Sequence, residues 1–250
     1  LYDHRLSEAA RASFYADEWS VASEADRIGY RYKGGRPLAF LPREQPFGAG
    51  SDPSTIVDAG YPIGSIQVPS GQEPIILHRD AVSGGGYAMI ATVISADMDW
   101  VGQMQPNDKA RFIAVTPPLY MADTPEKDSA RYNAVLDIYA GWLNGQKNKG
   151  WLVADMRPGL SRQIRTAKEK NPGFIYAPDG VHPGPEGHLL IARSVWPAVA
   201  SFLNLPPDVR FPEGDAFRKI LERHNLFKLA WLTETGHKRP GIPAGVPIAK

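Results

Sequence analysis

The sequence predicts a mixed α/β protein with a β-rich portion over residues 1–115 and a partial α/β layered portion over residues 116–210. A helix and an extended tail are predicted to follow over residues 211–250. Between about residues 20 and 115, Gly and Pro recur every few residues between short apolar runs, as strands and tight turns require. After residue 116, strand-like runs alternate with helix-like segments, which is typical of an α/β layer.

Composition narrows the classes of partner and of site. The 250 residues include 28 Lys and Arg against 27 Asp and Glu, without a run of either sign, so neither nucleic acid nor a membrane is predicted as a partner. The absence of Cys excludes disulfides, thiolate metal sites and a cysteine nucleophile, and no metal site is predicted. No apolar run approaches the ~20 residues of a membrane-spanning helix. The sequence leaves the cellular compartment open and favours the cytoplasm.

The β-rich portion is predicted to begin with a helix and to continue as strands. Leu6, Ala9, Ala10 and Phe14 recur at the three- and four-residue spacing of a helix within the first 20 residues. The segments after it alternate apolar stretches with turn-forming residues. The clearest strand candidates are Ile63–Val68, Pro74–Leu77 and Met89–Ile94.

A strand, a helix and a second strand are predicted between residues 111 and 155. Arg111–Val115 and Trp151–Asp155 are the strand candidates. Between them, Thr124 can cap a helix start and Pro125 suits the first helical position. Gly145 ends this helix, which carries an apolar stripe at helical spacing. The stripe consists of Val135, Ile138, Tyr139, Trp142 and Leu143.

The C-terminal part predicts a further amphipathic helix and a tail. His188–Leu203 has helical periodicity, and Pro197 inside it is expected to bend the helix. Residues 236–250 are rich in Gly, Pro and Lys and show no periodicity, which predicts a loosely held tail.

Four motifs in residues 2–115 resemble one family. In chain order they are Ser23–Tyr32 (SEADRIGYRY), Gly64–Pro69 (GSIQVP), Asp80–Tyr87 (DAVSGGGY) and Gln103–Phe112 (QMQPNDKARF). They resemble the allophanate hydrolase subunit 2 family, which includes the carboxyltransferase domain of urea carboxylase and a subunit of bacterial 5-oxoprolinase. The resemblance implies two cyclophilin-like β-barrel lobes with the active site between them. Only the second lobe has a counterpart here, so a partner subunit is expected to supply the other.

Residues of these motifs are the predicted substrate contacts. Gln67 offers a donor and an acceptor to an amide or ureido group, and Asp80 beside Arg79 offers a charge pair. Three consecutive glycines at 84–86 would let backbone amides approach an anion such as a carboxylate. The predicted substrate-binding residues are Arg27, Gln67, Arg79, Asp80, Ser83 and Gly85.

Each of these residues also has a structural interpretation. A run of three glycines also forms an ordinary loop, and an Asp–Arg pair is also a surface ion pair. Asp26 and Arg27 would also clamp the entry of a strand. No nucleophile is evident in this portion. The binding and structural interpretations therefore both stay open at the level of sequence.

The segment Ala177–His188 (APDGVHPGPEGH) resembles a second family. It is similar to the last block of SGNH or GDSL hydrolases, in which an Asp-x-x-His pair precedes the final helix. A strand ending at Thr116–Pro118, a helix carrying Tyr132 and Asn133, and a strand ending at Asp155 also fit. The resemblance covers residues 111–204 and implies the C-terminal part of a three-layer, flavodoxin-like α/β fold.

Asp179 and His182 are the predicted catalytic residues of the second portion. The resemblance implies that His182 is the general base toward a serine, and that Asp179 accepts a hydrogen bond from the other ring nitrogen. In the alternative interpretation Asp179 caps a turn and His182 packs beside the start of the helix. The family's Gly-Asp-Ser and Gly-x-Asn blocks have no counterpart, because the pair Gly214–Asp215 is followed by Ala216. The predicted base therefore has no serine of its own.

The run Ala110–Val115 fits both families. It suits the last strand of the first and the strand before Thr-Pro-Pro of the second. We expect the two portions to join here, with a strand at 111–115 linking them into one packed body, since unpaired sheet edges promote aggregation.

Three functions follow from the sequence. The first is a partial carboxyltransferase or amidohydrolase-type module for amide, ureido or carboxybiotin-like small molecules, impaired as an isolated chain. It would bind no cofactor directly, and biotin would be carried by a partner. The second is a remnant of an SGNH-type ester hydrolase. The third is a catalytically silent composite or a binding module, so whether the chain is an enzyme stays open.

Overall fold

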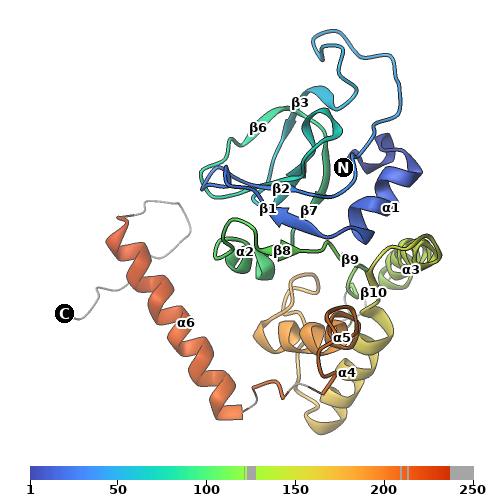
Figure 1. Cartoon of the computed structure of the whole chain (residues 1–250). Helices are drawn as coiled ribbons and strands as arrows, with labels where there is room; N and C mark the ends of the chain where they lie inside the picture. Colours follow the sequence, from blue (N-terminus) through green and yellow to red (C-terminus); the bar gives the residue numbers. More distant parts are fainter. Residues whose placement is uncertain (121, 123–127, 209, 213, 237–250) are drawn as a thin grey trace. The chain divides into compact units, whose positions relative to one another are not determined.

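A computed structural model describes residues 1–120, 122, 128–208, 210–212 and 214–236 (Figure 1). The chain forms two compact units. Unit 1 combines Leu1–Thr116 with Asp137–Asp155, and unit 2 combines Pro117–Leu136 with the chain from Met156 onward. The mixed α/β class is confirmed, with a β-sheet portion and helices. Because the units follow packing whereas the predicted portions followed family resemblance, their boundaries differ.

Unit 1 contains a six-stranded antiparallel sheet in the order β7-β4-β5-β2-β1-β8. The predicted segments 63–68, 74–77 and 89–94 each contain one of its strands, so these predictions are confirmed. The strands are β1 Trp19–Val21, β2 Gly29–Lys33, β4 Ser65–Gln67, β5 Ile75–Leu77, β7 Met89–Thr92 and β8 Lys109–Ala110.

A second antiparallel pair in unit 1 joins β3 (Thr55–Gly60) to β6 (Gly84–Tyr87). Short helical segments connect the strands of the unit. They are η2 (Pro69–Gly71) after β4 and α2 (Ser95–Val101) after β7. The barrel that the family resemblance implies stays a prediction.

The predicted N-terminal helix is confirmed as a short turn, η1 (Asp3–Arg5), followed by α1 (Glu8–Ala16). The Ser7 hydroxyl caps α1 by accepting a hydrogen bond from a backbone amide three residues on, at 3.1 Å. Of the predicted stripe, Ala9 is exposed and the other members are buried in the core of unit 1. That core consists of Leu6, Ala10, Phe14, Trp19, Val21, Tyr32, Leu38, Ile66, Val68, Ile76, Ile90, Met98 and Val101.

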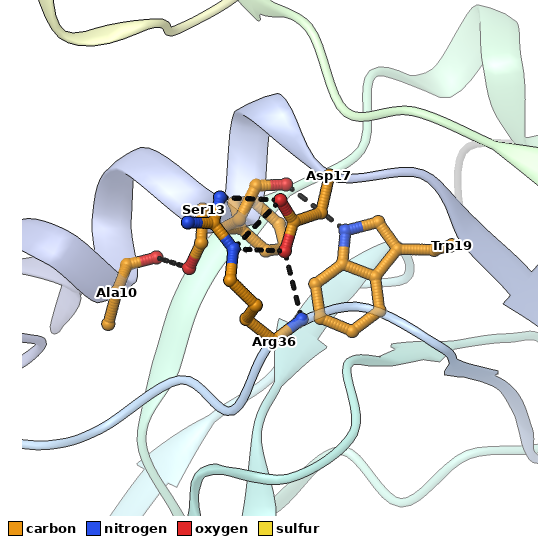
Figure 2. Close-up of polar contacts among 6 residues, drawn as sticks. Ala10, Ser13, Asp17, Trp19 and Arg36 are labelled. Atoms are coloured by element: carbon orange, nitrogen blue, oxygen red, sulfur yellow. Dashed lines mark hydrogen bonds and ion pairs between the residues drawn. The ribbon is translucent and has the colours of Figure 1, made fainter.

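An ion pair fixes the end of α1 to the loop after β2 (Figure 2). Arg36 contacts the Asp17 carboxylate through Nη2 at 2.6 Å and Nε at 3.0 Å, and its backbone amide donates to the same carboxylate at 2.9 Å. The guanidinium lowers the pKa of Asp17. Next to this pair, the Trp19 indole donates to the Phe14 carbonyl at 3.2 Å. Gly35 lies so close to the indole that a Cβ there would be 2.5 Å from the ring.

The predicted strand at 111–115 is confirmed in shortened form, as β9 (Ala114–Val115). Residues 111–113 are not in a strand, and the run ends one sheet and begins another. The ladder is interrupted where Phe112 packs against the core of unit 1 and stacks on Phe14, with ring centroids 4.3 Å apart. After it, β9 (Ala114–Val115) pairs in parallel with β10 (Val153–Ala154), which confirms the second predicted strand in shortened form. Both sheets belong to unit 1.

The helix between these strands is α3 (Ser129–Gly145), and η3 (Gln146–Lys149) follows it. The predicted start at Thr124 and Pro125 lies outside the described residues. The apolar stripe mostly faces solvent, and Ile138 is 71% exposed. Leu143 packs against a buried cluster formed by Ala114, Trp151 and Val153, and the Trp142 ring meets Trp151 of that cluster edge-on, with ring centroids 5.7 Å apart.

Unit 2 contains α4 (Arg157–Lys170), α5 (Pro185–Leu203) and α6 (Gly214–Glu234). The predicted helix at 188–203 is confirmed as α5, which contains Pro197, and the bend expected at this proline stays a prediction. The helix predicted after residue 211 is confirmed in α6. The sequence did not predict α4, which packs against α5 where Gly159 meets Ser194. No described residue of α6 is buried. The predicted tail is described only at Gly236.

Candidate functional site

Asp80 and Arg79, which the sequence predicted as a charge pair, each pair with another residue in the structure. Asp80 contacts Arg27, with Nε 3.0 Å from Oδ2, while Arg79 lies 3.7 Å from Asp99. The Asp80 backbone amide also donates to the Arg27 carbonyl at 3.0 Å. The Arg27 side chain is 83% exposed. Exposed pairs of this kind contribute at most ~1 kcal/mol to stability, so both side chains are available to a ligand.

The clamp at the strand entry is made by Asp26. Its carboxylate accepts hydrogen bonds from the backbone amides of Ile28 at 2.8 Å and Gly29 at 3.0 Å, and these bonds lower its pKa. Gly29 is the first residue of β2, so the structural interpretation is confirmed for Asp26. Arg27 instead faces Asp80.

Gln67 is the buried polar residue of this region. It ends β4, lies opposite Ile75 and beside Met89 in the sheet, and is 6% exposed. Ile75 and Met89 both pack in the cluster that contains Tyr61. A carboxamide at such a depth must find hydrogen-bonding partners, because burying it without them is unfavourable.

Tyr61 is the functional candidate that sequence reasoning missed. Its hydroxyl lies 2.5 Å from the Gly85 carbonyl and 2.7 Å from the Tyr87 carbonyl, and it accepts from the Tyr87 amide at 2.9 Å. Burial raises the pKa of the Tyr61 phenol, and hydrogen bonds from the Tyr87 backbone and the Gln67 side chain partly oppose that effect. The signal in the sequence was a tyrosine between Gly60 and the GSIQVP motif, opposite a run of glycines.

The three glycines at 84–86 form strand β6, so the loop interpretation is wrong for them. Their backbone pairs with β3. Some of the backbone amides that were predicted to bind an anion are therefore used within the sheet. A Cβ at Gly85 would lie 3.2 Å from the Tyr61 ring, a tight contact that would require the ring to shift by a few tenths of an ångström. The neighbouring Ser83 accepts from the Tyr61 backbone amide through its carbonyl at 2.8 Å, and its side chain is exposed.

The structure therefore brings most of the predicted residues of unit 1 into two adjoining groups. Ser83 and Gly85 contact Tyr61, and Gln67 is paired in the sheet with Ile75 and Met89, which pack in the Tyr61 cluster. Arg27 and Asp80 form the exposed pair, and the residue after Asp80 packs against the Tyr61 cluster. Arg79 lies outside both groups. Together they combine a buried amide, a phenol and a solvent-facing charge pair, which suit a small polar ligand.

The Asp179–His182 dyad lies on the loop before α5 in unit 2. Nδ1 of His182 is 2.6 Å from Asp179 Oδ2. The other carboxylate oxygen accepts from the backbone amides of Val181 at 2.9 Å and His182 at 2.7 Å. These bonds, with the backbone bond from His182 first, strongly lower the pKa of Asp179. Asp179 thus both caps a turn and orients the imidazole.

Nothing that the structure describes completes this dyad. His182 is 83% exposed rather than packed against the helix, and its hydrogen bonds within the described chain are to Asp179 alone. Asn133, which fitted the family pattern, ties the loop after β9 by accepting from the Tyr120 amide at 3.1 Å and donating to its carbonyl at 2.8 Å. Buried Arg157 supports the same loop by donating to the Pro118 carbonyl at 2.7 Å.

Neither a hollow in unit 2 nor any cluster of possible metal ligands in the described part of the chain coincides with the predicted site residues. A hollow of about 500 Å³ in unit 2 is lined by residues that include Leu119, Ile164 and Lys168, and contains none of the predicted site residues. Among the described residues, no three His, Asp or Glu side chains gather closely enough to hold a metal ion. In the same part of the chain, no helix is long and apolar enough to cross a membrane.

Known proteins are similar to the portion of the chain that carries the four motifs in residues 2–115. Residues 1–114 match the family model "Carboxyltransferase domain, subdomain A and B". The chain is 35% identical over 103 residues to a 5-oxoprolinase subunit of Haemophilus influenzae, covering 41% of this chain and 30% of that protein. It is 28% identical over 171 residues to urea amidolyase of Saccharomyces cerevisiae, covering 67% and 9%.

A solved structure gives a looser match. The crystal structure of Kluyveromyces lactis urea carboxylase is 21% identical, covers 72% of this chain and 13% of that chain, and has a TM-score of 0.41. The chain therefore spans less than a third of the length of each of these relatives. The resemblance of residues 2–115 to carboxyltransferase-type proteins is confirmed, and this portion is a carboxyltransferase-like domain related to urea amidolyase and 5-oxoprolinase subunits. The resemblance to SGNH hydrolases stays a prediction.

Proposed function

We propose that the carboxyltransferase-like domain binds an amide, ureido or carboxybiotin-like small molecule at Gln67, together with a partner subunit that supplies a facing lobe. Biotin would be a substrate carrier on that partner and would not be bound as a resident group. The observation that supports this proposal best is the depth of Gln67, an amide that is 6% exposed and whose sheet partners Ile75 and Met89 pack in the cluster that contains Tyr61. A ligand that completes its hydrogen bonding would gain specificity from it, since buried amides discriminate strongly between paired and unpaired partners.

The Arg27–Asp80 pair would recognise a second part of the ligand. Both side chains are exposed, Arg27 belongs to the Ser23–Tyr32 motif, and Asp80 is the first residue of the Asp80–Tyr87 motif. A guanidinium binds carboxylates with two parallel hydrogen bonds, so a ligand carboxylate could replace Asp80 at Arg27. Ser83 and Gly85 belong to the same motif and contact Tyr61 through the backbone. The combination favours small molecules that carry both an amide-like group and a negative charge.

Calorimetry of the full chain tests this proposal with biotin, 5-oxoproline and urea derivatives, alone and with a partner subunit. We expect at least one of these ligands to bind, and Gln67→Leu to weaken it about 10-fold or more, because the variant offers no hydrogen bond. The matched control is Gln72→Leu, which changes an exposed glutamine of the same domain and should leave affinity unchanged. If no ligand bound under either condition, or if Gln67→Leu bound as well as wild type, the proposal would fail.

A second candidate function is ester hydrolysis, which the 2.6 Å contact between Asp179 and His182 favours. An imidazole held in this way can act as a general base only toward a nucleophile within reach. A fluorophosphonate probe tests for such a serine in the full chain. Labelling that His182→Ala abolishes and the exposed control His188→Ala preserves would support this function. Absence of labelling would exclude ester hydrolysis. If neither ligand binding by calorimetry nor labelling were observed, a binding module or a catalytically silent composite would be favoured.

A further inference from the structure

The hollow in unit 2 has the dimensions of a small-molecule site. Its volume of about 500 Å³ falls within the range of about 300–1,000 Å³ that is usual for ligand pockets. The described residues that line it all belong to unit 2, so the lining comes from one compact unit. They are Leu119, Ala122, Ser161, Ile164, Arg165, Lys168 and Glu169. None of them belongs to the site proposed in unit 1, so a ligand bound here would add to that function.

Apolar side chains form one part of this lining. Ile164 of α4 is 5% exposed, and Leu119 is half-buried. Ala122 adds a small apolar side chain from the same segment as Leu119, and the Lys168 amino group ties α4 to this segment by donating to the Ala122 carbonyl at 3.4 Å. Apolar groups of a ligand would gain free energy by leaving water for such a surface.

Two opposite charges on successive turns of α4 border the hollow. Arg165 and Glu169 are four residues apart, so their Cβ atoms lie about 5–6 Å from each other on one face of the helix. This spacing permits an ion pair, yet both side chains are exposed and neither forms a hydrogen bond or ion pair with the described part of the chain. Ser161, one turn before Arg165, adds an exposed hydroxyl. The hollow therefore offers a cation, an anion and an apolar surface together.

Helix stability explains only some of these charges. The last turn of a helix carries a partial negative charge, which Lys168 and Lys170 complement in α4. Glu169 lies in the same turn, where a carboxylate is unfavourable. An ammonium group bound beside Glu169 would offset this repulsion.

We propose that the hollow binds a small zwitterion with an apolar side chain, of the chemical class of leucine. The carboxylate of the ligand pairs with the Arg165 guanidinium, which can donate two parallel hydrogen bonds to it. The Ser161 hydroxyl is a further donor for this carboxylate. The ammonium group of the ligand pairs with Glu169, and its side chain lies against Leu119 and Ile164.

NMR titrations of the ¹⁵N-labelled full chain test the proposal. The probes are leucine, 4-methylpentanoate, which lacks the ammonium group, and 3-methylbutylamine, which lacks the carboxylate. Leucine is expected to cause saturable shifts at the backbone amides of Ser161 and Ile164. It should bind about 5-fold more tightly than either analogue, because each analogue lacks one exposed ion pair. Glycine, which has no apolar side chain, should bind more weakly than leucine.

Two substitutions separate the contributions of the charges. Arg165→Gln should weaken leucine about 5-fold and leave the affinity for 3-methylbutylamine unchanged. Glu169→Gln should weaken leucine to a similar extent without weakening 4-methylpentanoate, because that ligand has no ammonium group. The control Arg162→Gln changes an exposed arginine of the same helix that does not line the hollow, and should keep the wild-type affinities.

Ser161→Trp tests the hollow independently of charge. The residue is exposed, so a larger side chain can be introduced without disturbing the core, and it should fill the hollow and abolish leucine binding. Undiminished binding by this variant would overturn the proposal. So would the absence of leucine-dependent shifts at Ser161 and Ile164 in wild type, or equal affinities for leucine and its two analogues. Equal losses in Arg162→Gln and Arg165→Gln would also overturn it, since general surface charge would then explain the binding.

Discussion

Gly35 and Trp19 are in closer contact than any larger residue at position 35 would allow. A Cβ built there would lie 2.5–2.7 Å from ring atoms of Trp19, which is fully buried and cannot move aside freely. We expect Gly35→Ala to lower the free energy of unfolding by about 1–3 kcal/mol through overpacking. Urea denaturation measures the change.

Gly141→Ala is the matched control for that substitution. Nothing lies within 4 Å of a Cβ at this position in the middle of α3. The better helix propensity of Ala should raise stability by about 0.5–1 kcal/mol. Equal effects of the two substitutions would contradict the steric account of Gly35.

The Asp17–Arg36 pair makes a second prediction at the residue scale, on pH dependence. The pKa of Asp17 is lowered in the folded chain, so the unfolded chain binds a proton at a higher pH than the folded chain does. The stabilisation is therefore present above about pH 4 and is lost as pH falls through the lower folded value. Asp17→Asn should cost about 1 kcal/mol at pH 7, since Arg36 is largely exposed, and less at pH 3.

Urea denaturation of the wild-type protein and of Asp17→Asn at pH 7 and at pH 3 measures this loss of stability. Asp80→Asn provides a comparison, because its pair with Arg27 is more exposed on both sides and should contribute less. A deficit of Asp17→Asn that stayed constant between pH 7 and pH 3 would show that the ion pair is not its cause.

At the scale of elements, local patterns predicted the strands but not their partners. Gly and Pro spacing located β4, β5 and β7, because turn residues mark the ends of short strands in any sheet. The strand predicted at 111–115 is shorter than expected, because Phe112 stacks on Phe14 of the helix near the start of the chain, and no local pattern shows that contact. The glycines of β6 resembled a loop for a similar reason. In the structure the Tyr61 ring leaves little room for a side chain at Gly85, a contact that the local sequence does not show.

Helix α4 was missed because its sequence is dominated by charged and polar residues. Leu160 and Ile164, four residues apart, are its main buried apolar side chains. Two such residues do not distinguish a helix from a polar loop in sequence. Among the site residues, motif spacing identified Gln67, Ser83 and Gly85, whereas Tyr61 makes its contacts with backbone 24 and 26 residues away. Such contacts leave no short-range pattern.

At the scale of the molecule, the packing of unit 1 predicts which fragment is stable. Residues 137–155 belong to this unit, where Trp151 stacks on Tyr15 at 4.3 Å between ring centroids and β10 pairs with β9. We expect a chain of residues 1–155 to be more stable than one of residues 1–116 by about 3–5 kcal/mol, the range for losing a large buried aromatic residue. Urea denaturation of the two fragments checks this.

Limited proteolysis of the full chain provides an independent observation on the same point. Cleavage between residues 116 and 128 would sever the chain without removing residues 137–155 from the fold. The two products should then stay associated during gel filtration. Separation into two independently stable pieces would contradict the assignment of residues 137–155 to unit 1, as well as the expectation that the portions form one packed body.

The ring of Tyr61 also offers a spectroscopic reporter for the domain. Its oxygen touches two carbonyls and one amide of a strand whose glycines carry no side chains of their own. Replacing Tyr61 alone with 3-fluorotyrosine would place a ¹⁹F nucleus on that ring. Its chemical shift would follow any displacement of β6, so the binding of a ligand could be detected without an assay of activity.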